Sequence, residues 1–291
     1  RQNTGWEERW EMVVLTEHGN LIDTRMVTSN RELVRGQGRV HLDHWSESSI
    51  PITHTRELHP DDVEIDVHGN GLRLGLDQLK LDDFWTLDIG STEVNLMLEM
   101  RPYVASPPPV SMVQNGGQWS MDALVPGGNV FGWLEAGGRG GRFRGRGVLL
   151  HRGGDIPAEL PRESIFLFGK DTAIGIEMQQ GQQLAWATLN GENIATVDLQ
   201  FSRHANGATL DFRPSVDLLI EVQAQNPVGT TDPLNHYSWI ERMASEIFTD
   251  VGWRRLEAGV ATIEYGEEAQ VLGAILLSEG PDLEPLDSEV F

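Results

Sequence analysis

Apolar and polar residues alternate with a period of two along most of this chain, which is the pattern of β-strands with one buried face. The clearest case spans residues 6–16, where one face is aromatic and acidic. The residues on that face are Trp6, Glu8, Trp10, Met12 and Val14. Turn signals recur roughly every ten residues, a spacing that favours antiparallel meanders closing into barrels or sandwiches. The sequence therefore predicts a mostly β fold.

A segment with two prolines and several polar residues, IPAELPRES over 156–164, separates two series of such strands. Proline and polar residues are typical of linkers, because few contacts cross a boundary between domains. A chain of 291 residues has room for two domains of ordinary size. We therefore predict two consecutive antiparallel β domains, each a barrel or a sandwich, an N-terminal domain over 1–157 and a C-terminal domain over 158–291.

One segment has helical rather than strand periodicity. Asp232 is a good N-cap, and Pro233 suits the first position of a helix. Apolar residues then follow on one face at helical spacing, at Leu234, Tyr237, Ile240, Met243, Ala244, Ile247 and Phe248. We predict one amphipathic helix over 233–248 in the C-terminal half.

The charge balance excludes several classes of partner. With 44 acidic and 22 basic residues, the formal net charge is −22, which disfavours phosphate backbones and anionic membrane surfaces. No apolar run is long enough to span a bilayer. The chain has no cysteine, so it can form no disulfide or zinc-thiolate site, and it fits a cytoplasmic location. We expect no nucleic-acid partner and no membrane span, and leave a homodimer open.

Four segments, in this order, resemble a known family. They are EERWEMVVLTEHGN (7–20), QWSMDALVPGGNVFGWLE (118–135), GRGVLLHRGGD (145–155) and GVATIEYGEEAQVLGAILLSE (259–279). Together they are similar to the hydroxyneurosporene synthase or carotenoid hydratase family. Relatives of that family include proteins with two lipocalin-like barrels and fungal Diels–Alderases that close decalin rings. The resemblance implies two lipocalin-like barrels and a hydrophobic small-molecule substrate.

The resemblance rests on individual anchor positions, and it has two departures. The anchors are Glu8, Trp10, Trp119, Pro126, Gly145, Gly147, His151 and Gly154. Val148 stands where the family has a Tyr, and Leu150 stands where it has an Asp. Hydration of an alkene requires an acid that can protonate carbon, and Leu150 cannot supply that proton. The departures therefore favour a cyclase or isomerase over a hydratase.

Glu8 and His151 are the candidate catalytic residues. Strand parity places His151 on one face with Phe143 and Leu149, and Glu8 on one face with Trp6 and Trp10. In a dry interior Glu8 could act as a general acid, and His151 could donate a hydrogen bond or a proton. The alternatives are a structural Glu held by an Arg and a core histidine whose hydrogen bonds are satisfied.

Aromatic residues are the candidate substrate-binding set, because aromatic walls suit a conjugated ligand. They are Trp6, Trp10, Trp119, Trp133, Phe143 and Tyr265. Glu264 has the opposite parity to Tyr265, so at most one of the two can face a barrel interior. The run GGRGGRFRGRG over 137–147 resembles an RNA-binding tract, but a glycine hairpin with solvated arginines is the better interpretation.

No metal or cofactor site is predicted. On a strand, His41 and His44 would point to opposite faces, and the chain has no nucleophile elbow, phosphate loop or dinucleotide motif. We predict a cofactor-independent cyclase or isomerase that acts on a hydrophobic polyene, polyketide or isoprenoid intermediate in a cavity at or between the barrels. The alternatives are a carotenoid-type hydratase, a carrier of an apolar molecule, and a structural β protein with a filled interior.

Overall fold

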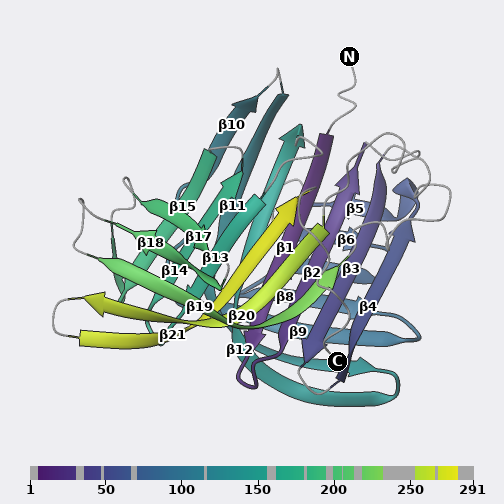
Figure 1. Cartoon of the computed structure of the whole chain (residues 1–291). Coiled ribbons are helices and arrows are strands. Elements are labelled where there is room, and N and C mark those ends of the chain that lie inside the picture. The colour runs from purple at the N-terminus through teal and green to yellow at the C-terminus, as the bar shows by residue number, and fades with distance from the viewer. Residues whose placement is uncertain are drawn as a thin grey trace. The chain divides into compact units, whose positions relative to one another are not determined.

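A computed structural model gives the fold of the chain (Figure 1). It describes residues 6–30, 36–46, 49–66, 71–114, 117–155, 162–179, 182–194, 199–204, 206–212, 218–231, 253–265 and 268–280. The helix predicted over 233–248 lies outside these residues. The chain divides into two compact units, Arg1–Ile156 and Pro157–Phe291, and each is described by itself.

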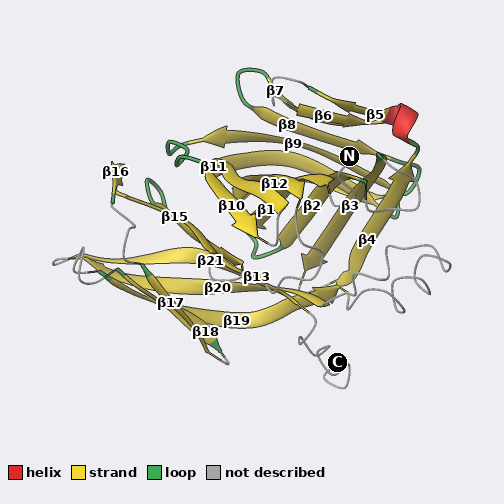
Figure 2. Ribbon diagram, turned by 90° about the horizontal axis from the view of Figure 1, so that it is seen from above, coloured by secondary structure: helices red, strands yellow, loops and turns green. Residues whose placement is uncertain are grey.

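The first unit is a strongly curled antiparallel sheet, seen from above in Figure 2. Its elements are β1 (Trp6–Thr16), β2 (Leu21–Ser29), β3 (Gln37–Ser46), β4 (Ser49–Leu58), the short 3₁₀-helix η1 (Pro60–Asp62), β5 (Val63–Ile65), β6 (Gly71–Leu74), β7 (Asp77–Leu81), β8 (Trp85–Gly90), β9 (Val94–Pro102), β10 (Val110–Gln114), β11 (Gly117–Ala136) and β12 (Arg139–Asp155). The strand order is β4-β3-β2-β1-β12-β11-β9-β8-β7-β6-β5, with β10 paired to β11.

Side chains link the two ends of this strand order. Arg56 on β4 donates to the carbonyl of Gly90 at 3.0 Å and forms an ion pair with the buried Asp77 of β7. The other Asp77 oxygen accepts the backbone N–H of Gly90 at 3.0 Å. The sheet is therefore curled far enough for β4 to meet β7 and β8, as in a barrel.

The period of two predicted for β1 decides which of its residues face the core. Trp10, Met12 and Val14 belong to one hydrophobic cluster with Met26 of β2 and Leu149 of β12. We call the face that carries this cluster the core face. Residues of opposite parity lie on the other face of the sheet, because successive side chains of a strand point to opposite sides.

The hairpin of β11 and β12 has two local features that follow from its sequence. Gly137 and Gly138 both have positive φ, 58° and 73°, which a tight hairpin turn requires and glycine accepts without strain. The pairing of β11 with β12 shifts register once on each side of Val125, and the second shift extends to Gly128. Pro126 lies within the second shift, and its missing N–H interrupts the ladder of backbone hydrogen bonds. The glycine- and arginine-rich run over 137–147 is therefore a hairpin, as predicted.

The second unit is a second curled antiparallel sheet. Its strands are β13 (Arg162–Phe168), β14 (Ala173–Gln179), β15 (Gln182–Leu189), β16 (Glu192–Asn193), β17 (Gln200–His204), β18 (Gly207–Asp211), β19 (Leu219–Thr231), β20 (Trp253–Tyr265) and β21 (Glu268–Gly280). Their order is β16-β15-β14-β13-β21-β20-β19-β18-β17. In each unit the first strand lies between the second and the last. The predicted mostly β fold of two lipocalin-like antiparallel barrels is confirmed.

Candidate functional site

Glu8 and His151 form a hydrogen-bonded pair on the core face of the first unit. Nε2 of His151 lies 2.6 Å from Oε2 of Glu8, and the two side chains are only about a fifth to a quarter exposed (25% for His151 and 20% for Glu8). The register of β1 and β12 pairs Trp10 with His151 and Glu8 with Gly153. The two polar side chains are thus diagonal neighbours on one face, within reach of each other.

Gly153 provides the space that the Glu8 carboxylate occupies. A Cβ built on Gly153 would lie 2.6 Å from Oε2 and 2.7 Å from Oε1 of Glu8, far inside van der Waals contact. A side chain at this position would therefore displace Glu8. Gly153 of the 145–155 segment therefore has a local function, because the Glu8 carboxylate lies directly over its backbone.

Trp10 packs against the ring of His151. The ring centroids are 4.5 Å apart with an interplanar angle of 31°, and Trp10 is buried. Its indole Nε1 has no hydrogen-bond partner among the residues that the structure describes. A buried donor of this kind is costly unless something accepts its hydrogen bond.

Asp122 also lies on the core face, beside the Glu8–His151 pair, and the sequence reasoning missed it. The register of β11 and β12 places it directly opposite His151. Burial raises the pKa of the Asp122 carboxyl, and the nearby His151 opposes that rise. Asp122 therefore takes up a proton more readily than an exposed aspartate does. The sequence pattern that could have revealed it is the alternation of residues 117–123, in which Asp122 has the parity opposite to Trp119.

The predicted aromatic set is divided between the two faces. Trp6 shares the parity of Glu8 on β1, and Phe143 packs against the core cluster. Trp119 pairs with Gly154 and is buried on the other face. Trp133 also has the parity of the other face and is 39% exposed. Tyr265 ends β20, but its side chain lies outside the described part of the structure.

The two histidines of β3 do not lie together. His41 bonds Asp43 Oδ2 through Nε2 at 2.6 Å and Thr55 through Nδ1 at 2.9 Å, on the face opposite the core. Strand parity places His44 on the core face, where burial lowers its pKa. Within the described ranges, no three His, Cys, Asp or Glu residues are grouped so that they could hold a metal ion. Those ranges also contain no helix long and apolar enough to cross a membrane.

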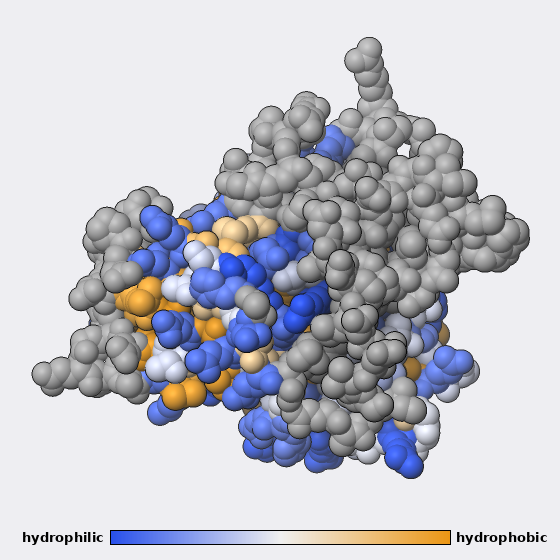
Figure 3. Space-filling view, viewed as in Figure 1, coloured by the Kyte–Doolittle hydropathy of each residue, from blue (hydrophilic) through white to orange (hydrophobic). Residues whose placement is uncertain are grey.

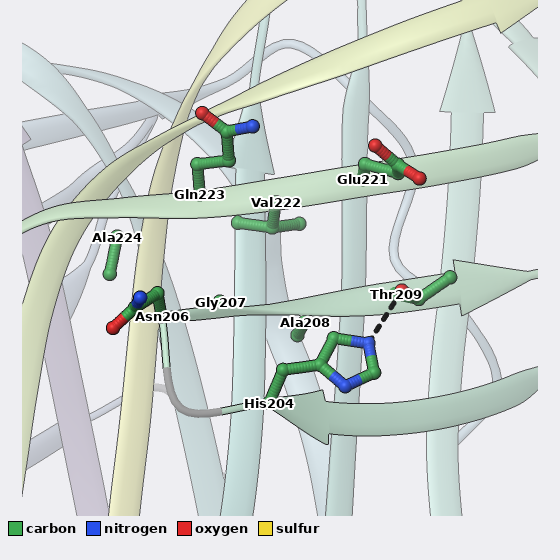
Figure 4. Close-up of a pocket in the computed structure, with 9 residues that line it drawn as sticks. All are labelled: His204, Asn206, Gly207, Ala208, Thr209, Glu221, Val222, Gln223 and Ala224. Atoms are coloured by element: carbon green, nitrogen blue, oxygen red, sulfur yellow. Dashed lines mark hydrogen bonds between the residues drawn. The ribbon is translucent and has the colours of Figure 1, made fainter.

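A surface pocket of about 610 Å³ lies in the second unit, over strands β17, β18 and β19 (Figure 4). Glu221, Gln223 and Thr209 line it with His204, whose Nε2 is 2.9 Å from Oγ1 of Thr209. None of the predicted site residues lines this pocket. Where the surface is coloured in Figure 3, hydrophilic and hydrophobic residues are mixed.

No protein-family model matches the chain, and no curated protein matches it. Solved structures do match over almost the whole length. CghA, solved with Sch210972, has a TM-score of 0.66 at 8% identity, covering 95% of this chain and 89% of CghA. Kievitone hydratase from Nectria haematococca has a TM-score of 0.53 at 10% identity, covering 97% of this chain and 91% of the hydratase.

A third match is a protein assigned as AttH from Nitrosomonas europaea, with a TM-score of 0.59 at 10% identity. The match covers 95% of this chain and 93% of the Nitrosomonas chain. Identities this low establish the shared fold. The three matches therefore confirm, at the level of the fold, the resemblance that the four sequence segments indicated.

Proposed function

We propose that the chain is a cofactor-independent cyclase or isomerase that acts on a hydrophobic polyene, polyketide or isoprenoid intermediate on the core face of the first unit. The observation that supports this proposal is the cluster of Glu8, His151 and Asp122, three titratable groups from three adjacent strands, beside the apolar residues of the core face. Structural neighbours named as a hydratase and as a protein solved with Sch210972 agree with small-molecule chemistry on this fold.

Each residue of the cluster has a chemical role in this proposal. Asp122, whose pKa is raised by burial, donates a hydrogen bond or a proton to a substrate carbonyl. Glu8 fixes the ring of His151 from one side, and Trp10 packs on it from another. Nε1 of Trp10 is a second donor for the same carbonyl. The apolar wall holds the chain of the substrate in a reactive conformer, an effect worth several kcal/mol.

Asp122 also favours a second candidate, a hydratase. The sequence lacks an acid at Leu150, but Asp122 offers a carboxylic acid on the neighbouring strand, opposite His151. In hydration, this acid would protonate an alkene carbon, and water would then add to the cation and lose a proton to the Glu8–His151 pair. The proton count closes, because one proton enters at carbon and one leaves from water.

The experiment incubates the purified full-length protein in ¹⁸O-labelled water with a linear polyene that carries a carbonyl-activated diene and an alkene. Chiral chromatography with mass detection follows the products against a buffer control. An isomeric product of unchanged mass, formed faster or with a different stereoisomer ratio than in buffer, supports the cyclase or isomerase. A product containing labelled oxygen supports the hydratase.

The Glu8→Gln and His151→Ala variants then test the site. Loss of the accelerated product in both variants, with unchanged circular dichroism, supports chemistry at this pair. Wild-type turnover in both would remove the pair from the mechanism. Tight binding of the polyene with no conversion would contradict both enzymatic candidates and leave carriage.

A further inference from the structure

The second unit repeats the placement of the two carboxylates found in the first. In the first unit, Glu8 lies two residues before Trp10, whose partner on the last strand, His151, pairs with Asp122. In the second unit, Glu163 of β13 lies two residues before Ile165. The partner of Ile165 on the last strand is Leu276, which pairs with Glu257 of β20.

This second cluster also lies on a core face. Ile165 and Leu276 belong to the hydrophobic cluster of the second unit. Glu163 has the parity of Ile165 on β13, and Glu257 lies directly opposite Leu276. Arg203, on the edge strand β17, pairs with Ala208, a member of the same cluster. The basic partners of the carboxylates are what differ between the units.

In the second unit Leu276 stands at the position of His151, and arginines from other positions are the basic partners of the carboxylates. Nη2 of Arg255 lies 2.7 Å from Oε1 of Glu257, and Arg203 forms an ion pair with Oε2 of the same carboxylate, which is buried. Glu163 accepts a hydrogen bond from Oγ of Ser278 at 2.8 Å and lies 3.9 Å from Nε of Arg203. Arg203 therefore reaches from the edge of the sheet to two interior strands.

The cluster sets two guanidinium groups, of Arg203 and Arg255, against two carboxylates, of Glu163 and Glu257. Glu257 can neutralise only one of the two guanidinium groups. Burial raises the pKa of Glu163, Glu257 raises it further, and Ser278, Arg203 and Arg255 oppose the rise. With both carboxylates ionised the two guanidinium groups are just neutralised, and a proton taken up by Glu163 would leave one positive charge for an anion. Nε of Arg255 is buried and has no hydrogen-bond partner among the described residues, so one donor of the fork is unused.

We propose that this cluster is a second ligand site, which binds the acidic head group, a carboxylate or an enolate, of an otherwise apolar molecule at the core face of the second unit. Arg255 and Arg203 donate charge-assisted hydrogen bonds to the anion. Glu257 holds the two guanidinium groups in place. The side chains of Arg203, Arg255 and Glu163 are 22%, 26% and 33% exposed, so the cluster is open to a ligand. The apolar tail follows the wall of the unit.

The test is a fluorescence titration of the full chain with cis-parinaric acid and with its methyl ester, which share one polyene tail and differ only in the anion. A charge-assisted hydrogen bond is worth enough to predict about tenfold tighter binding of the acid. Arg255→Gln should remove that preference. Glu8→Gln, in the first unit, and Arg139→Gln, at the exposed tip of the β11–β12 hairpin, should retain it.

Equal affinity of the wild-type chain for the acid and the ester would overturn the proposal, and this result requires no variant. A preference that persists in folded Arg255→Gln would also overturn it. Loss of the preference in Glu8→Gln instead would place the anion at the first unit and contradict the assignment. Because the readout is binding rather than turnover, it is independent of whether the first unit is catalytic.

Discussion

Replacement of Gly153 by Ala tests whether the Glu8–His151 pair matters, without removing either residue. Gly153 does not have a positive φ, so alanine is compatible with its backbone, but the added Cβ would lie 2.6 Å from a Glu8 oxygen. Ordinary Cβ contacts begin at 3.4 Å, so the carboxylate must retreat by about 0.8 Å. Such a retreat would lengthen the 2.6 Å distance between Glu8 and His151 beyond that of a charge-assisted hydrogen bond. The bond to His151 is then lost.

A hydrogen bond to a charged group contributes roughly 1.5–3 kcal/mol, and each 1.36 kcal/mol changes a rate about tenfold. We therefore expect kcat/KM for the polyene to fall by about 10- to 100-fold in Gly153→Ala. The fall in unfolding free energy should be no more than about 1 kcal/mol, because the pair is partly exposed. Turnover is followed by chromatography, and stability by urea unfolding.

Gly141→Ala is the matched control, because it lies on the same strand and a Cβ there meets nothing within 4 Å. It should retain wild-type kcat/KM. Wild-type turnover in Gly153→Ala, together with a crystal structure that shows the Glu8–His151 bond broken, would refute the catalytic role of the pair. An intact bond in that crystal structure would refute the steric reasoning instead.

Three further predictions concern single groups. Trp10→Phe keeps the ring beside His151 but removes the unpartnered N–H, so kcat should fall for a carbonyl-bearing polyene and not for a polyene without a carbonyl. Glu163 has a raised pKa in the folded state, so its contribution to stability is lost as pH rises above about 4.3, the ordinary glutamate value. In the Glu163→Gln variant, the midpoint of urea unfolding should not show this fall as the pH is raised. Burial raises the pKa of Asp43, but His41 and Arg25 together lower it by more, so the pKa lies well below the usual range. The stability that ionised Asp43 gives the fold is therefore lost as pH falls. Asp43→Asn should lower the unfolding free energy at pH 7 by about 3 kcal/mol and flatten the acid side of the pH profile, and an unchanged acid limb would contradict the assignment.

The fold could be predicted from the sequence because alternation and turn signals depend on local physics. The parity of β1 placed Glu8 beside Trp10, and the parity of β12 placed His151 on the same face as Leu149. What could not be predicted depends on register between strands. Asp122 meets His151 only through the pairing of β11 with β12.

Irregular strands and long-range contacts also limited the prediction. Two register shifts flank Val125, which faces the core although the core-facing residues on either side, Asp122 and Val130, have even numbers, so alternation alone misassigns this part of β11. In the second unit, Glu163 and Ser278 are 115 residues apart in sequence but bonded in the fold. Strands at this separation leave no local sequence pattern that would reveal the contact.

The most direct test of the central claim is the rate of product formation by Asp122→Asn. Asparagine has nearly the same shape as aspartate but cannot deliver a proton, and Asp88→Asn on an exposed position of β8 is the matched control. We predict that kcat/KM falls at least tenfold in Asp122→Asn and stays at the wild-type value in Asp88→Asn. Equal rates in the two variants and the wild-type protein would contradict acid-assisted chemistry on the core face of the first unit.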